Sequence, residues 1–88
     1  MKYNNSKSLL AKAHKLIPDQ TMTFAKGAHN FPSEAPSYIQ SAKGCHFTDV
    51  DGNDFIDYTM GLGTAVLGYS DPEVTKAVLD QASKGTLY

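Results

Sequence analysis

The sequence of 88 residues contains one cysteine, no arginine, no tryptophan and no long apolar run. The single Cys45 excludes an internal disulfide and is typical of a reducing compartment, so we expect a cytoplasmic chain. The eight basic residues, all lysines, face nine acidic ones, which argues against nucleic-acid binding. No apolar stretch approaches the ~20 residues of a membrane span, and no apolar signal segment follows the first residues. The expected partners are small molecules or protein surfaces.

A chain of this length forms at most one small domain and hides only about 60–65% of its unfolded surface on folding. Its histidines, His14, His29 and His46, are scattered without the paired spacing of a metal site. With neither a disulfide nor a structural metal, we expect the isolated chain to be marginally stable.

The dipeptide Asp51-Gly52 lies between two β-prone runs that together extend from Cys45 to Tyr58, which predicts a β-hairpin. With Asp51 and Gly52 as a two-residue turn, the predicted cross-strand pairs are Val50 with Asn53, Asp49 with Asp54, Thr48 with Phe55, Phe47 with Ile56 and Cys45 with Tyr58. A pair of carboxylates in register is unfavourable unless both point to water or the loop is wider. We expect the acidic residues of the turn to be solvated.

This acidic cluster does not have the spacing of a calcium-binding loop. Counted from Asp49, an EF-hand loop requires glycine at its sixth position and glutamate at its twelfth, where the sequence has Asp54 and Met60. We therefore predict no metal site.

Two amphipathic helices are predicted, one near each end of the chain. In the first, apolar residues recur at helical spacing from Ser6 to Ile17, with Asn5 or Ser6 as the expected N-cap and Pro18 as the stop. The connection that follows, residues 19–36, is a long loop.

The second predicted helix starts after Asp71, an N-cap residue, with Pro72 at its first position. Its expected buried stripe consists of Val74, Ala77, Val78 and Ala82. Asp80 and Lys84 form an expected surface pair, and Gly85 is the expected C-terminal cap.

The remaining segments give a strand and two irregular connections. Residues 37–42 predict a short strand that completes a three-stranded antiparallel meander with the hairpin. Phe24 and Phe31, in the long loop, are expected to anchor it to a larger surface.

The connection between the hairpin and the second helix contains Gly61, Gly63 and Gly68, but it does not have the spacing of a phosphate-binding loop. A dinucleotide fingerprint from Gly61 requires glycine where Val66 stands, and a P-loop from Gly63 requires lysine where Tyr69 stands. What remains is an apolar, glycine-rich connection able to bend closely around a ligand or another chain.

Six short motifs occur in a fixed order along the chain. They are Leu16-Ile-Pro18, Ala42-Lys-Gly44, Asp49-Val-Asp-Gly-Asn53, Phe55-Ile-Asp-Tyr58, Leu67-Gly68 and Asp71-Pro-Glu-Val74. Each motif is common by itself, but the ordered set resembles the N-terminal segment of a class III pyridoxal-phosphate-dependent aminotransferase. The likeness is to the glutamate-1-semialdehyde 2,1-aminomutase-like branch and covers nearly the whole chain from Ser6 onward.

The resemblance implies an α/β chain of the aspartate-aminotransferase fold (fold type I), in the order helix, long loop, three-stranded antiparallel meander, glycine-rich connection, helix. Residues 1–88 are then the N-terminal part of the minor domain and lead into the major domain, without the catalytic core. The parent enzyme is expected to be a homodimer that holds pyridoxal 5'-phosphate on a lysine outside this chain. It moves an amino group between a small-molecule amino donor and a carbonyl substrate.

We therefore expect no catalytic and no cofactor-binding residue in this chain, and no activity by the chain alone. The alternative is a small independent α+β interaction module without catalysis. Its binding face would consist of Phe24, Phe31 and the hairpin.

The resemblance implies three substrate-binding residues, Lys26, Leu62 and Gly63. In the aminomutase an arginine in the loop after Leu-Ile-Pro engages the substrate carboxylate, and ungapped alignment places Lys26 there, a point charge in place of a bidentate fork. Relatives line the substrate channel with an aromatic residue before a glycine, where this chain has Leu62-Gly63. The missing ring widens the pocket and favours a transaminase with another substrate. We assign no chemical role to Tyr69.

Overall fold

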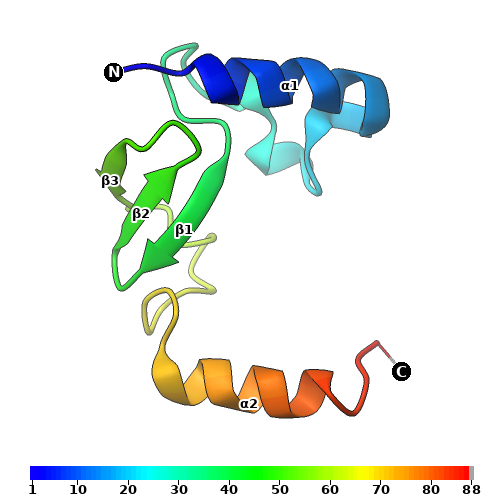
Figure 1. Ribbon diagram of the computed structural model, residues 1–88, viewed down its shortest axis with the longest axis vertical. Helices are drawn as coiled ribbons and strands as arrows, with labels where there is room; N and C mark the ends of the chain where they lie inside the picture. The colour runs from blue at the N-terminus through cyan, green and yellow to red at the C-terminus, as the bar shows by residue number, and fades with distance from the viewer. Residues whose placement is uncertain (88) are drawn as a thin grey trace.

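The computed structural model describes residues 1–87 and has the expected order of elements (Figure 1). The elements are α1 (Asn4–Leu16), the short 3-10 helices η1 (Pro18–Gln20), η2 (Phe24–Lys26) and η3 (Ala28–Asn30), β1 (Ile39–Lys43), β2 (His46–Asp49), β3 (Asp54–Ile56) and α2 (Pro72–Ala82). The two helices lie at opposite ends of the molecule with the sheet between them (Figure 1). This arrangement confirms the predicted helix, loop, meander, connection and helix.

Helix α1 ends before Pro18, as predicted, because its C-cap residue Ile17 has an extended backbone. Its start differs from the prediction. The N-cap residue is Tyr3, which provides no side-chain hydrogen bond, so the assignment of Asn5 or Ser6 as the cap was wrong. The acceptor that replaces the missing cap comes from the hairpin loop, as the next subsection describes.

The sheet is an antiparallel meander in the order β1-β2-β3, which confirms the prediction. Lys43 pairs with His46, so Gly44 and Cys45 form the turn between β1 and β2. Gly44 has φ +59°, a left-handed conformation in which glycine has no side chain to clash.

The predicted register of the second hairpin was wrong by one residue. The observed pairs are Thr48 with Asp54, Phe47 with Phe55 and His46 with Ile56. The phenylalanine rings, predicted on opposite faces, therefore share a face and stack with centroids 5.0 Å apart. The predicted pair of carboxylates does not form, because Asp54 accepts a hydrogen bond of 2.7 Å from the Thr48 hydroxyl instead.

The register shifts because the hairpin loop has three residues, Val50 to Gly52, rather than two. Asp49 donates its N–H to the Asn53 carbonyl (2.9 Å), and its carbonyl accepts from the Gly52 N–H (3.1 Å). Gly52 has φ +84°. This is a turn followed by a left-handed glycine bulge, the common form of a three-residue hairpin loop.

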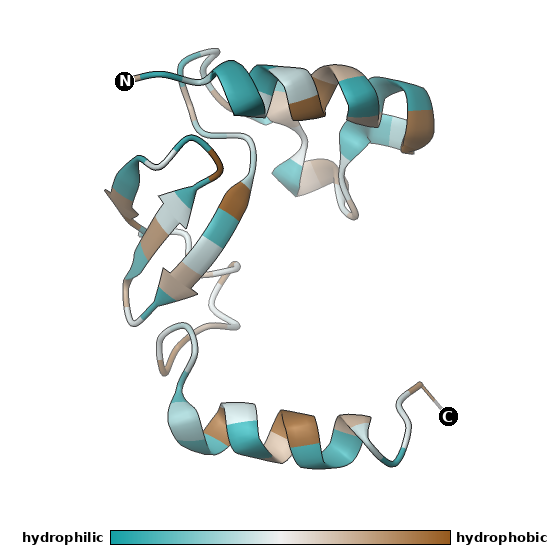
Figure 2. Ribbon diagram, in the orientation of Figure 1, coloured by the Kyte–Doolittle hydropathy of each residue, from teal (hydrophilic) through white to brown (hydrophobic). Residues whose placement is uncertain are grey.

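Helix α2 begins as predicted, with Asp71 accepting a hydrogen bond from the Val74 N–H (3.0 Å) and Pro72 at the first position. Its predicted buried stripe was wrong for this chain, because every residue of α2 is exposed. Apolar residues recur along the helix (Figure 2), and within residues 1–87 they all remain exposed. Asp80 pairs with Lys76 (2.6 Å) rather than with Lys84.

The buried interior is small and mostly polar. Within residues 1–87 the one buried apolar side chain is that of Ala13, while Ser6 and Asp49 are buried polar residues. Ser6 belongs to α1 and Asp49 to β2, so the most buried side chains lie where the start of the helix meets the hairpin. Neither α1 nor α2 is long and apolar enough to cross a bilayer.

Candidate functional site

The predicted substrate-binding residues lie in two separate segments. Lys26 is the last residue of η2, which lies below α1, whereas Leu62 and Gly63 lie in the connection between the sheet and α2 (Figure 1). All three are exposed. Within residues 1–87 no hydrogen bond joins the two segments, so the fold of this chain does not by itself bring Lys26 and Leu62 into one site.

The segment around Lys26, within the predicted long loop, is a succession of short 3-10 turns. Phe24 and His29 pack their rings at 4.8 Å, and the Asn30 side-chain amide donates to the Phe24 carbonyl (2.7 Å). These contacts fold the chain around the buried Gly27, next to Lys26. Phe24 nevertheless remains exposed.

Leu62 and Gly63 belong to a left-handed turn of four consecutive residues. Met60, Gly61, Leu62 and Gly63 have φ values of +48°, +62°, +61° and +92°. This conformation costs a non-glycine residue about 1–2 kcal/mol, and it persists only where the surrounding contacts hold it. Backbone strain of this kind is concentrated at functional sites.

Three backbone hydrogen bonds close the turn. Leu62 donates to the Thr59 carbonyl (2.9 Å), and Gly63 and Ala65 both donate to the Met60 carbonyl (3.1 and 3.0 Å). The Leu62 side chain is 71% exposed, so its apolar surface is available to a ligand or to another part of the protein.

Asp57 and Tyr69 join the two ends of this connection. The Tyr69 hydroxyl donates to Asp57 Oδ2 at 2.5 Å, while Asp57 Oδ1 accepts from the N–H groups of Thr59 (2.8 Å) and Met60 (3.1 Å). Desolvation raises the pKa of Asp57, but the Tyr69 hydroxyl and the two amides outweigh it and lower the pKa overall. The same hydrogen bond, with desolvation and the negative charge of Asp57, raises the pKa of Tyr69.

Sequence reasoning missed the role of Tyr69, because a tyrosine and an aspartate twelve positions apart carry no local signal. Gly68, the residue before Tyr69, did carry a local signal in the sequence. A Cβ atom on Gly68 would lie 3.0 Å from the Gly44 Cα atom, and Gly68 has φ +85°, so a side chain at this position would be crowded by the Gly44 backbone and strained in its own.

The hairpin loop is built around the buried carboxylate of Asp49, which is 0% exposed. Its Oδ1 atom accepts from the N–H groups of Asp51 (2.9 Å) and Asn53 (2.8 Å), and Oδ2 accepts from the Asn53 side-chain amide (2.9 Å). A buried carboxylate is tolerated only when such donors satisfy it. The prediction that these acidic residues are solvated was therefore wrong for Asp49.

Asp51, the next acidic residue, caps α1 although it lies 46 positions after Asn5 in the sequence. Its two carboxylate oxygens accept from the N–H groups of Asn5 (2.7 Å) and Ser6 (2.9 Å), and Asn53 donates its side-chain amide to the Lys2 carbonyl (2.9 Å). A negative charge is stabilising at the N-terminus of a helix, where backbone N–H groups have no partner within the helix. Desolvation raises the pKa of Asp51, but the Ser6 and Asn5 amides lower it overall.

Residues 1–87 do not provide a site for pyridoxal phosphate. The cofactor requires a lysine held against its ring and a partner for the ring nitrogen. All eight lysines are exposed, and Lys76 is paired with Asp80 along α2. The lysines of residues 1–87 therefore do not fit the requirements of the cofactor.

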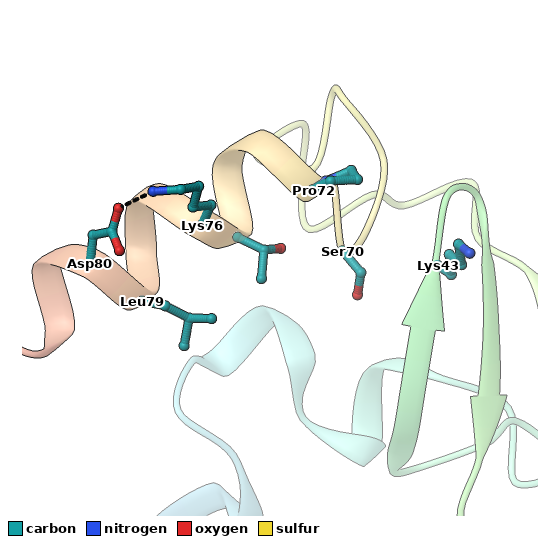
Figure 3. Close-up of a pocket in the computed structure, with 7 residues that line it drawn as sticks. Lys43, Ser70, Pro72, Lys76, Leu79 and Asp80 are labelled. Atoms are coloured by element: carbon teal, nitrogen blue, oxygen red, sulfur yellow. Dashed lines mark hydrogen bonds and ion pairs between the residues drawn. The ribbon is translucent and has the colours of Figure 1, made fainter.

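An open hollow of about 580 Å³ lies between the end of β1 and α2. Its lining includes Lys43, Ser70, Thr75, Lys76 and Leu79, with Lys43 on the side of the sheet and the helix residues opposite it (Figure 3). None of the predicted substrate-binding residues lines it. Since α2 is exposed along its whole length, we interpret the hollow as the uncovered side of the helix rather than as a substrate pocket.

Comparisons with known proteins identify the family. The model of the family described as aminotransferase class-III matches residues 23–88. Over 83 residues, which are 94% of this chain, the sequence is 42% identical to the glutamate-1-semialdehyde 2,1-aminomutase of Desulfovibrio desulfuricans. It is 44% identical over 84 residues to the protein of the same name from Thermoplasma volcanium. The chain spans 19% of the length of each of these relatives.

Solved structures agree with this sequence relationship. A structure described as a transaminase with PLP bound matches all of this chain and 20% of its own, with a TM-score of 0.81 and 30% identity. The PLP internal aldimine form of the Sphingopyxis sp. MTA144 FumI protein matches 91% of this chain and 19% of its own, with a TM-score of 0.76 and 29% identity. The predicted fold is thereby confirmed, and the chain belongs to the class-III aminotransferase family.

Proposed function

We propose that this chain is one part of a pyridoxal-phosphate-dependent aminotransferase or aminomutase that moves an amino group between an amino donor and a carbonyl substrate. The observation that carries the proposal is the match of nearly the whole chain, at 42% identity, to a glutamate-1-semialdehyde aminomutase. The structural match to a transaminase with PLP bound supports the same activity class.

The chain alone has no activity under this proposal. Its residues form the N-terminal part of the minor domain and lead into the major domain, and the lysine that binds the cofactor lies elsewhere in the complete enzyme. The exposure of all eight lysines supports this division, as does the relatives' length, of which the chain spans about a fifth. We place the complete enzyme in the cytoplasm as a homodimer.

Lys26, Leu62 and Gly63 contribute to the substrate site. The left-handed turn at Met60–Gly63 supports this assignment for Leu62 and Gly63, because its strain requires support from other contacts. Lys26 supplies a cation for a substrate carboxylate. With an aliphatic residue at position 62 in place of an aromatic ring, the pocket accepts a substrate other than glutamate semialdehyde.

A chimeric enzyme tests the activity class. The matched segment of the Desulfovibrio desulfuricans aminomutase is replaced by this chain, and cofactor absorbance and amino transfer are measured with and without an external keto acid. We expect the chimera to hold pyridoxal phosphate and to transfer amino groups, whereas the isolated 88-residue chain holds none after dialysis. Activity that newly requires the keto acid shows that this segment favours a transaminase reaction, and activity without it shows that the segment supports the aminomutase reaction of the host.

Two results would contradict the proposal. One is a folded chimera that binds the cofactor but moves no amino group to any acceptor. The other is an absorbance band on the isolated chain that survives dialysis and disappears when one lysine is replaced. The interaction-module alternative requires an independently folded chain. The described part of the chain, residues 1–87, buries a single apolar side chain, that of Ala13, which argues against this alternative.

A further inference from the structure

The connection between the sheet and α2 is a closed loop whose two ends meet at the turn between β1 and β2. At its start, Asp57 donates its N–H to the Cys45 carbonyl (2.8 Å). At its end, Tyr69 donates to the Gly44 carbonyl (2.8 Å) and accepts from the Gly44 N–H (2.9 Å). Residues 58–68 therefore leave and return at adjacent positions, as in compact surface loops that are frequently functional.

The Asp57 carboxylate connects the closure of this loop with its strained turn. One of its oxygens accepts the Tyr69 hydroxyl, which fixes the returning end of the loop. The other accepts the N–H groups of Thr59 and Met60, where the left-handed turn begins. One side chain, that of Asp57, therefore joins Tyr69 to the backbone of Met60.

The strain in the turn requires such a support. Met60 and Leu62 have left-handed backbones although neither is glycine, and the turn holds the Leu62 side chain outward. A hydrogen bond to a charged group is among the stronger ones available to a folded chain. Among residues 1–87, the side chain that accepts backbone N–H groups at the start of this turn is that of Asp57.

We propose that Asp57 and Tyr69 form a positioning pair that holds the left-handed turn Met60–Gly63, and thereby sets the position of Leu62 in the substrate site. The inference rests on the proposed function for the role of Leu62. Neither member of the pair touches the substrate, so both act through Leu62. The pair determines how well the amino donor binds and leaves the cofactor unchanged.

The variant Tyr69→Phe tests the pair in the complete enzyme, because it removes the hydroxyl and keeps the ring. Tyr58→Phe is the matched control, since Tyr58 is 91% exposed and also loses one hydroxyl. In Tyr69→Phe we expect amide hydrogen exchange in residues 59–65 to rise about tenfold, the effect of one hydrogen bond to a charge. We expect a similar rise in KM for the amino donor, with kcat and the cofactor absorbance unchanged. Tyr58→Phe should match the wild type in all four measurements.

Hydrogen exchange tests whether Asp57 and Tyr69 position the turn, even when the kinetic measurements do not. Exchange in residues 59–65 that stays within twofold of the wild type in Tyr69→Phe overturns the pair, and so does a loss of kcat without a change in KM. If Tyr69→Phe does not fold, Asp57→Asn takes its place, with the same expected rise in exchange. A wild-type enzyme without amino transfer contradicts the proposed function alone, because the exchange result still stands.

Discussion

Asp49 shows how one side chain sets the geometry of a whole hairpin. Its carboxylate is buried and accepts hydrogen bonds from the N–H groups of Asp51 and Asn53. These bonds hold the loop at three residues, which shifts the strand register by one residue from the predicted register. The shift places Phe47 and Phe55 on the same face. A residue that the sequence presents as one more surface charge is therefore the organising group of the loop.

Lys26 is expected to bind the carboxylate of acidic substrates. It is the only lysine between Pro18 and Pro36, so Lys26→Ala in the complete enzyme removes the cation available there to a substrate carboxylate. Because a charge-assisted hydrogen bond at an exposed site is partly screened, we expect about a tenfold loss of kcat/KM for acidic donors. Steady-state kinetics with acidic and neutral donors measure it, with Lys12→Ala as the control. An effect within twofold for every donor, or a loss of cofactor absorbance, would remove Lys26 from the substrate site.

Leu62 provides the second prediction. Leu62→Trp adds a large ring at a position that already accepts a non-glycine residue at φ +61°, so the backbone cost does not change. We expect the narrower pocket to raise KM for bulky donors about tenfold relative to small ones, with the cofactor absorbance unchanged. Kinetics over a series of donor sizes measure this. Val66→Trp, which lies outside the left-handed turn, is the control, and an equal effect of both variants would contradict the pocket assignment.

The sequence predicts those helices and strands whose formation depends on residues that are close together along the chain. Both helices and the meander were predicted correctly, because apolar periodicity, Pro18, Pro72 and the Asp71 cap act over a few residues. The hairpin register was not predictable, because the two-residue and three-residue loops both suit a left-handed glycine at position 52. The choice depends on burial of the Asp49 carboxylate, which is a tertiary property.

Long-range contacts account for the other differences. The acceptor for the start of α1 is Asp51, 46 positions from Asn5, so no window of the sequence around the helix contains it. The pair of Asp57 and Tyr69 is likewise absent from any local pattern. For the candidate site, the resemblance supplied Leu62 and Gly63, while the left-handed turn that carries them came only from the structure.

The link between Asp51 and α1 predicts a dependence on pH. Hydrogen bonds lower the pKa of Asp51 in the folded chain, so its contribution to stability is complete above the ordinary carboxyl pKa of about 4 and is lost as the pH falls through the lower folded value. In the complete enzyme we expect hydrogen-exchange protection of the Asn5 and Ser6 amides to be constant from neutral pH down to about 5 and to fall below about 4.

The variant Asp51→Asn separates this effect from general acid unfolding. It keeps one acceptor oxygen but cannot titrate, so protection of the two amides should be lower at neutral pH and should show no step near the Asp51 titration. Asp54→Asn is the control, because Asp54 bonds to Thr48 and not to α1. Equal protection in the wild type and Asp51→Asn would show that the carboxylate does not hold the helix.

The distribution of apolar side chains over the molecule determines whether the isolated chain folds and whether it self-associates. Most large apolar side chains on the connection and α2 are exposed, among them Leu62, Val66, Leu67, Val74, Val78 and Leu79. The curated relatives are about five times as long as this chain, and in the proposed complete enzyme such a surface is available to the other parts of the protein. Without a partner it is available to a second copy or to solvent.

We therefore expect the isolated 88-residue chain to unfold without a sharp transition or to self-associate. Sedimentation velocity and thermal melting measure the two outcomes, with the chimeric enzyme as the reference. A monomer that melts in one steep, cooperative step would show that Ala13 and the polar network of Asp49 are a sufficient interior. That result would favour the independent interaction module.

The cap on α1 also affects the order in which the chain folds during synthesis. Asp51 is added 46 residues after Asn5, which is roughly 2–9 s later at a translation rate of about 5–20 residues per second. During that interval α1, 13 residues long, has no acceptor at its start, and a helix of this length is marginal by itself. Helix α1 is therefore synthesised several seconds before the hairpin loop that caps its start.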